Sequence, residues 1–215
     1  PTSEQIKQGD LDLVIAGTHD AVMMDTGTTT LEVAKAMSIR AVPLTVITNS
    51  YVVATILGSN PLIRVIMPPG EFSAAEAAVL GFETNEFVRR FNANICIIGA
   101  SGITPAGPAN TNLDAARLKR TMMSRAHRTI LAADHSKFER NALETVCPWS
   151  DIGAVVTDRM PAKALIEILE SNGVALTVAL AGVRAQLLVR IRGDRGFYRQ
   201  PPARPAGANG RPGPH

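Results

Sequence analysis

Aromatic residues are scarce in this chain of 215 residues, where they make up 4% of the sequence. Proteins that bind single-stranded nucleic acid usually stack bases on aromatic side chains, so this composition argues against that function. Cysteine is also rare. Cys96 lies in an apolar run and Cys147 stands alone, so neither belongs to a metal-ligand pattern. So few cysteines are compatible with a reducing cytoplasm, which is the location we expect.

Long apolar runs are missing as well, and no stretch approaches the length of a transmembrane helix. Residues 1–4 are polar and lack the apolar core of a signal peptide. His19, His127 and His215 do not have the spacing of metal ligands. We therefore expect a protein with no membrane partner, no metal site and no bound cofactor.

The net charge of +3 is unevenly distributed along the chain. Residues 184–215 hold seven Arg and one acidic residue, whereas the other 183 residues hold 15 basic and 18 acidic ones. That larger part lacks the basic stripe of a nucleic-acid-binding domain. We expect a folded domain over residues 1–181 and a disordered tail, rich in Arg, Pro and Gly, over residues 182–215. Any DNA binding by the tail should be weak and independent of sequence.

Short apolar runs alternate with segments of helical periodicity. Runs typical of buried strands cover residues 21–25, 44–48, 63–67, 95–99, 129–133, 153–157 and 174–178. Helical segments cover residues 29–38, 50–58, 84–91, 113–126 and 161–171. Several runs are apolar throughout, as in parallel strands that are covered on both faces. The alternation predicts a doubly wound α/β fold with a mostly parallel sheet, in which ligands bind at the carboxyl ends of the strands.

The turn after the first predicted strand has the composition of an anion-binding site. Its residues are Asp25, Thr26, Gly27, Thr28, Thr29 and Thr30. Free N–H groups and the positive end of the helix dipole would face this turn, and Gly27 would allow close approach of a ligand. A phosphate is the ligand that this pattern favours. The alternative is that one of the threonines simply caps the helix.

Polar or glycine-containing turns follow the other predicted strands. They contain Asn49, Ser50, Gly70, Gly99, Ser101, Gly102, Asp134 and Lys137. Their joint occurrence predicts one shared cleft, with Lys137 and Lys119 as cations for a phosphate. Arg117 and Arg120 lie beside Lys119, and such a cluster is more typical of a solvated helix face. Asp134 is placed to orient Lys137 or a ligand hydroxyl, and the lone His135 is expected to be structural.

These motifs resemble, in order and spacing, the C-terminal effector-sensing domain of the DeoR-type bacterial transcriptional regulators. The matching segments are residues 25–29, 48–50, 99–103, 119–120 and 133–138. The last of them, with residues 140–142, is most similar to the glycerol-3-phosphate regulon repressor branch. The resemblance extends over about residues 10–178. It implies a fold related to ribose-5-phosphate isomerase and the acyl-CoA transferases, in a homo-oligomeric repressor that a phosphorylated sugar or polyol releases.

On this basis we expect an effector site without catalytic residues. Its residues would be Asp25, Gly27, Thr28, Thr29, Thr30, Asn49, Gly70, Gly99, Ser101, Gly102, Lys119, Asp134 and Lys137. Three features depart from the family pattern. No helix-turn-helix precedes the matching region, so we expect operator DNA to be bound only through a domain absent from this chain. Pro69 and Gly70 replace the usual glycine pair, and Glu139 stands where Gly is usual.

Two other functions remain open at this point. One is a sugar-phosphate isomerase, which would need a carboxylate base near the substrate carbons. The related isomerases carry acids in the turn that holds Ser101 here, and the nearest acid, Asp114, is better explained as a helix cap. The other is an oligomerisation module whose pocket no longer binds a ligand.

Overall fold

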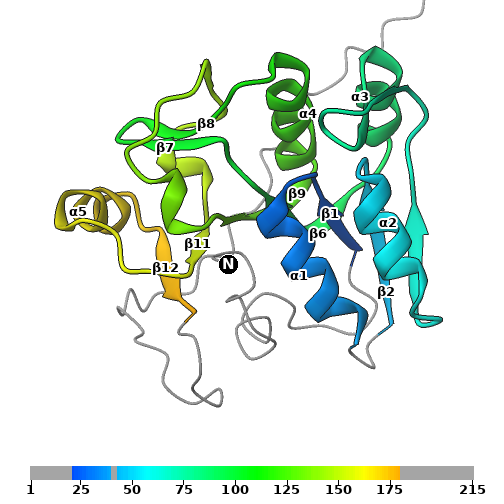
Figure 1. Ribbon diagram of the computed structural model, residues 1–215, viewed down its shortest axis with the longest axis horizontal. Coiled ribbons are helices and arrows are strands. Elements are labelled where there is room, and N and C mark those ends of the chain that lie inside the picture. The colour runs from blue at the N-terminus through cyan, green and yellow to red at the C-terminus, as the bar shows by residue number, and fades with distance from the viewer. Residues whose placement is uncertain (1–20, 40–42, 180–215) are drawn as a thin grey trace, which may run out of the picture.

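A sheet of seven strands, each parallel to its neighbours, forms the centre of the computed structural model, which describes residues 21–39 and 43–179 (Figure 1). The strand order is β12-β11-β9-β6-β1-β2-β3. The strands are β1 (Ala21–Met24), β2 (Leu44–Thr48), β3 (Ile63–Ile66), β6 (Ala93–Ile98), β9 (Ala126–Ala132), β11 (Ala154–Thr157) and β12 (Ala175–Val178). The predicted α/β fold with a parallel sheet is confirmed.

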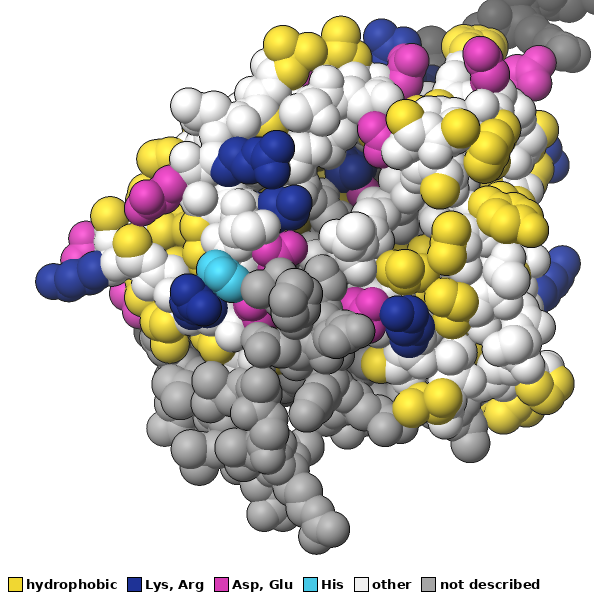
Figure 2. Space-filling model, viewed as in Figure 1, with side chains coloured by type: hydrophobic (Ala, Val, Ile, Leu, Met, Phe, Trp, Pro, Cys, Tyr) yellow, Lys and Arg dark blue, Asp and Glu magenta, His cyan; other side chains and the backbone are white. Residues whose placement is uncertain are grey.

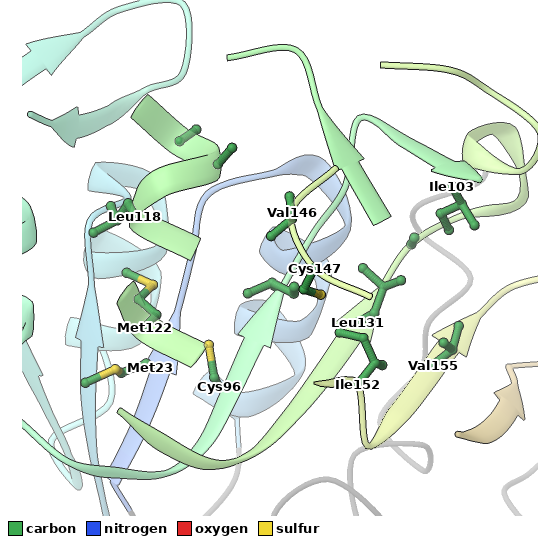
Figure 3. Packing of buried hydrophobic residues seen from close by; sticks show 14 of the residues in the cluster. Met23, Cys96, Ile103, Leu118, Met122, Leu131, Val146, Cys147, Ile152 and Val155 are labelled. Atoms are coloured by element: carbon green, nitrogen blue, oxygen red, sulfur yellow. The ribbon is translucent and has the colours of Figure 1, made fainter. Parts of the chain in front are cut away.

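Helices cover both faces of the sheet. They are α1 (Thr28–Ser38), α2 (Tyr51–Gly58), α3 (Phe82–Val88), α4 (Leu113–Ser124) and α5 (Lys163–Ser171). Strand β1 shows why this happens, since successive side chains of a strand point to opposite faces. Met23 packs in the cluster that contains Leu118 of α4 (Figure 3), while Val22 and Met24 pack in the cluster that contains α1 and α2 residues. No helix within the described ranges is long and apolar enough to cross a membrane.

Two small antiparallel sheets, which the sequence pattern did not predict, stand at the carboxyl edge of the main sheet. One is the hairpin of β4 (Glu71–Ser73) and β5 (Ala78–Leu80). The other joins β7 (Gly102–Thr104), β8 (Gly107–Asn110) and β10 (Glu144–Thr145). Each strand has only two to four residues, too few for a periodic pattern. The predicted tail of residues 182–215 lies outside the described residues.

The strand order of the main sheet indicates where along its carboxyl edge a ligand can bind. From β1 the chain moves outward through β2 and β3 and then returns to β6, on the other side of β1. The segments that follow β1 and β6 therefore diverge, which opens a crevice between them. The segment after β9 lies beside this crevice, because β9 is the other neighbour of β6.

Gly102, at the start of β7, is required for packing. A Cβ atom built at this position would overlap the backbone carbonyl of Arg140. We expect Gly102→Ala to lower the free energy of unfolding by about 1–3 kcal/mol, because backbone atoms cannot yield as a flexible side chain can. Urea unfolding measures this. The control is Gly58→Ala at the end of α2, where a Cβ meets nothing within 4 Å. An unchanged stability of Gly102→Ala would contradict the packing shown here.

Candidate functional site

A hollow opens at the crevice beside β1 and β6, and basic side chains gather around it (Figure 2). Its volume is about 220 Å³. The residues that line it are Thr26, Gly27, Thr28, Thr29, Glu76, Gly99, Ala100, Ser101, Asn110, Thr111, Lys119, Lys137 and Arg140. They come from the segments after β1 and β6, both hairpins, α4 and the segment after β9. The turns thus meet in one pocket, although not every predicted residue reaches it.

The turn after β1 presents the N-terminus of α1 to this pocket. Gly27 is the N-cap residue, and no side chain caps the helix. The alternative in which a threonine caps α1 is therefore wrong. Gly27 has a φ of +147°, a backbone conformation that favours glycine. Thr28 and Thr29 line the pocket, whereas Thr30 is buried and its hydroxyl donates to the Gly27 carbonyl at 2.9 Å.

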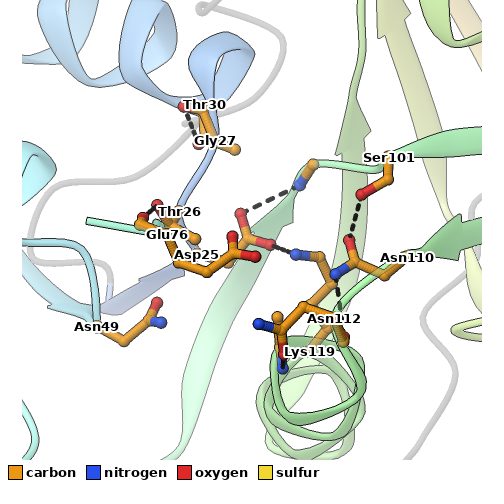
Figure 4. Close-up of polar contacts among 12 residues, drawn as sticks. Asp25, Thr26, Gly27, Thr30, Asn49, Glu76, Ser101, Asn110, Asn112 and Lys119 are labelled. Carbon is orange, nitrogen blue, oxygen red and sulfur yellow. Dashed lines mark hydrogen bonds and ion pairs between the residues drawn. The ribbon is translucent and has the colours of Figure 1, made fainter. Parts of the chain in front are cut away.

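A buried ion pair lies below the pocket (Figure 4). The carboxylate of Asp25 contacts the ammonium of Lys119, and both residues are at most 4% exposed. The other Asp25 oxygen accepts the Gly99 N–H at 3.1 Å. Burial raises the pKa of Asp25, although Lys119 and the Gly99 N–H act in the opposite direction and the charge of Glu76 adds to the rise.

Lys119 therefore does not belong to the solvated face that its basic neighbours suggested. The side chain of Arg117 is 69% exposed and that of Arg120 is 40% exposed, as such a face predicts. Lys119 points the other way, and it both pairs with Asp25 and lines the pocket. Asp114 is not the cap of α4, because Asn112 holds that position and accepts the Ala115 N–H at 3.1 Å.

The segment after β9 supplies Lys137. Asp134 caps the short 3₁₀ helix His135–Lys137 by accepting the Ser136 N–H at 2.9 Å, and the Thr29 hydroxyl donates to it at 3.5 Å. Burial alone would raise the pKa of Asp134, but the hydrogen bonds of Ser136 and the charges of Lys137 and His135 together lower it. Within the described ranges no ion pair joins Asp134 to Lys137, although their charges attract each other. The hydrogen bonds of Asp134 support the turn that carries Lys137.

Six predicted residues lie outside the pocket lining. Asp25, Thr30 and Asp134 have the contacts described above, and the other three also have structural contacts of their own. Asn49 is buried, and its amide donates to the Val79 carbonyl at 3.2 Å. Gly70 has a φ of +150°, and a Cβ there would overlap the Thr84 hydroxyl. Gly102 packs against the Arg140 backbone. His135, expected to be structural, has its Nδ1 atom 2.7 Å from a carboxylate oxygen of Asp158.

Six lining residues are not among the predicted site residues. Two of them, Thr26 and Ala100, lie within turns that the sequence did indicate. The other four lie outside those turns: Glu76, Asn110, Thr111 and Arg140. Asn110 and Thr111 come from β8 and its end, where the Ser101 hydroxyl donates to the Asn110 side chain at 3.2 Å. Glu76 lies in the turn of the β4–β5 hairpin. No local pattern marks these positions, because the hairpins bring them to the pocket. Only Arg140 had a signal, because it begins the segment of residues 140–142 that takes part in the family resemblance.

Known proteins similar to this chain are transcriptional repressors. The HTH-type transcriptional repressor GlcR of Bacillus subtilis is 29% identical over 177 residues, which cover 82% of this chain and 68% of the repressor. The glycerol-3-phosphate regulon repressor of Escherichia coli is 30% identical over 156 residues, which cover 72% of this chain and 62% of the repressor. The chain thus spans only part of each of these relatives.

Solved structures with a similar fold are more distant. Ribose-5-phosphate isomerase A from Neisseria gonorrhoeae has a TM-score of 0.45 and 15% identity, covering 63% of this chain and 52% of the isomerase. The Pyrococcus horikoshii translation initiation factor eIF-2B has a TM-score of 0.47 and 17% identity, covering 72% of this chain and 61% of the factor.

A protein family also matches more than half of the chain. Residues 12–159 match the DeoR C-terminal sensor domain, and this span includes every residue that lines the pocket. The chain therefore belongs to the DeoR family of transcriptional regulators and carries its C-terminal sensor domain.

Proposed function

We propose that this chain senses a phosphorylated sugar or polyol for a DeoR-family transcriptional repressor, which in its full form binds DNA and assembles as a homo-oligomer. One observation carries the proposal: the N-terminus of α1, which no side chain caps, opens into a pocket that three basic residues line. A helix N-terminus offers unpaired N–H groups and a positive dipole end, and both favour a phosphate.

The other side chains of the pocket suit a ligand whose carbon skeleton is short and carries hydroxyl groups. A phosphate on Thr28 and Thr29 would lie within the field of Lys137, Arg140 and Lys119. Ser101, Asn110 and Thr111 offer hydroxyl and amide groups on the opposite wall. The volume of about 220 Å³ is small beside the pockets of drug-sized ligands. One relative is named for a glycerol-3-phosphate regulon, which agrees with a ligand of this size.

Lys119 would act as a fixed charge in this site. Its ammonium is held by Asp25 under the pocket, so it contributes little net charge but cannot swing away from a ligand. Lys137 and Arg140 form no ion pair with any residue of the described ranges, which leaves both cations available to a phosphate. We therefore assign the main charge-assisted contacts to Lys137 and Arg140.

Thermal denaturation in the presence of phosphate esters tests the proposal. A ligand at about one hundred times its Kd adds about 2.7 kcal/mol of stability. For a protein of this size that corresponds to a rise in Tm of about 5–10 °C. Glycerol 3-phosphate and hexose phosphates at millimolar concentration should include at least one such ligand, whereas glycerol and free hexoses should have no effect. If no ester raises Tm, the pocket is not an effector site.

Substitution of Lys137 tests the placement of the phosphate. Lys137→Ala should weaken binding of the active ester about ten- to hundredfold in Kd, because a charge-assisted hydrogen bond is lost. Lys163→Ala on α5 is the matched control, since its side chain is 90% exposed and lies outside the pocket lining. Isothermal titration calorimetry measures both. Equal Kd values for the two variants would show that the phosphate does not bind beside Lys137.

The Asp25–Lys119 pair should behave as one energetic unit. Lys119→Met and Asp25→Asn each leave a buried polar partner behind and should each cost about 3–5 kcal/mol of stability, while the double variant should cost less than their sum. The pKa of Asp25 is already raised, and losing Lys119 raises it further. A raised folded-state pKa means that protonation favours the folded state, so the cost of Lys119→Met should shrink as the pH falls from about 7 to about 5.

Urea unfolding of the four proteins at both pH values measures this coupling. Additive costs, or a Lys119→Met cost that does not change with pH, would contradict it.

A further inference from the structure

Among the described residues that line the pocket, Glu76 is the one that is acidic. A carboxylate beside an anion site opposes the binding of a phosphate, so its presence needs a reason. No other described residue neutralises it, because Glu76 forms no ion pair within the described ranges. Its charge also reaches the pocket floor, where it adds to the raised pKa of Asp25, which is chiefly an effect of burial.

The backbone around Glu76 is held in place on both sides. The Thr26 hydroxyl, from the predicted phosphate turn, donates to the Glu76 carbonyl at 2.8 Å (Figure 4). The Tyr51 N–H, at the start of α2, donates to the Ala77 carbonyl at 3.1 Å. Ala77 has a φ of +48°, a left-handed conformation that a residue other than glycine keeps only when its surroundings impose it. The carboxylate can therefore move only as far as its own side-chain rotamers allow.

We propose that Glu76 determines which phosphorylated compounds the pocket accepts. Its carboxylate accepts a hydrogen bond from a hydroxyl of the ligand, and it repels a ligand that carries a second anionic group in that place. The effector is then a phosphorylated polyol or sugar and not a phosphorylated carboxylic acid. This inference rests on the proposed function, since it concerns the same pocket.

The chemistry of the pocket supports this selection. An ionised carboxylate only accepts hydrogen bonds, so a hydroxyl suits it and a second carboxylate does not. Specificity often arises from such a repulsive contact, which lowers the affinity for the correct ligand only slightly and the affinity for the competing ligand strongly. Lys137 and Arg140 supply the attraction for the phosphate, while Glu76 keeps the pocket from attracting every anion equally.

Two matched ligand pairs test the inference by calorimetry. Glycerol 3-phosphate and 3-phosphoglycerate differ only in a terminal hydroxymethyl or carboxylate group, and glucitol 6-phosphate and 6-phosphogluconate form the same pair with six carbons. The protein should bind the polyol ester of at least one pair tenfold or more tightly than its acid. Glu76→Gln should reduce that ratio about ten- to hundredfold, mainly because the acid binds better.

Glu71→Gln is the matched control, because Glu71 lies in the same hairpin but outside the pocket lining and loses the same charge. It should leave the ratio unchanged. If the esters bind but Glu76→Gln keeps the ratio, or strengthens both ligands equally, the inference is wrong and the proposed function stands. If the unmodified protein binds none of the four esters while other phosphorylated sugars raise its Tm, the inference is again wrong. If no phosphorylated compound binds, the proposed function fails as well.

Discussion

The ion pair between Asp25 and Lys119 joins three parts of the molecule at one buried carboxylate. Asp25 directly follows β1, Lys119 comes from the middle of α4, and the Gly99 N–H directly follows β6. A buried charge is tolerated only when its partners are well placed, so α4 must keep its position relative to the crevice. The floor of the pocket is therefore fixed by electrostatics, whereas the apolar clusters on each side fix the layers of the fold.

That arrangement divides the charges of the pocket into two groups. The charge of Lys119 is balanced beneath the surface by Asp25 and has a mainly positional effect. Lys137 and Arg140 come from one short segment after β9, and Glu76 comes from the β4–β5 hairpin, which precedes that segment in the chain. The N-terminus of α1 lies among them. A ligand in this site would thus meet fixed donors, together with two cations and one carboxylate that form no ion pair within residues 21–39 and 43–179.

The sequence was sufficient to predict the strands and helices of the main sheet, because buried parallel strands are apolar throughout and surface helices are periodic. It did not predict the hairpins, whose strands are too short to show a period. The burial of Lys119 also could not be predicted from the residues near it in the sequence. On its helix it stands between Arg117 and Arg120, and the partner that buries it is 94 positions away in the chain. Glu76 was missed for the same reason, since a hairpin turn acquires its role only through contact with Thr26.

Two of the three departures from the DeoR pattern concern positions where glycine is usual. At Gly70 the space for a Cβ is taken by the Thr84 side chain, whose hydroxyl donates to the Pro69 carbonyl at 2.9 Å. Glycine remains at position 70, and Pro69 replaces only the other glycine of the usual pair. Glu139, where glycine is usual, has a φ of +56°. A residue other than glycine thus adopts the left-handed conformation here, at a conformational cost of about 1–3 kcal/mol.

Glu139 lies between Lys137 and Arg140, the two cations of the rim, and both of these line the pocket. A chain that kept Glu139 in an extended conformation would turn Arg140 in another direction. The contact of Gly102 with the Arg140 backbone holds the other side of this bend. The left-handed conformation of Glu139 and the contact at Gly102 therefore both contribute to placing the two cations beside the N-terminus of α1.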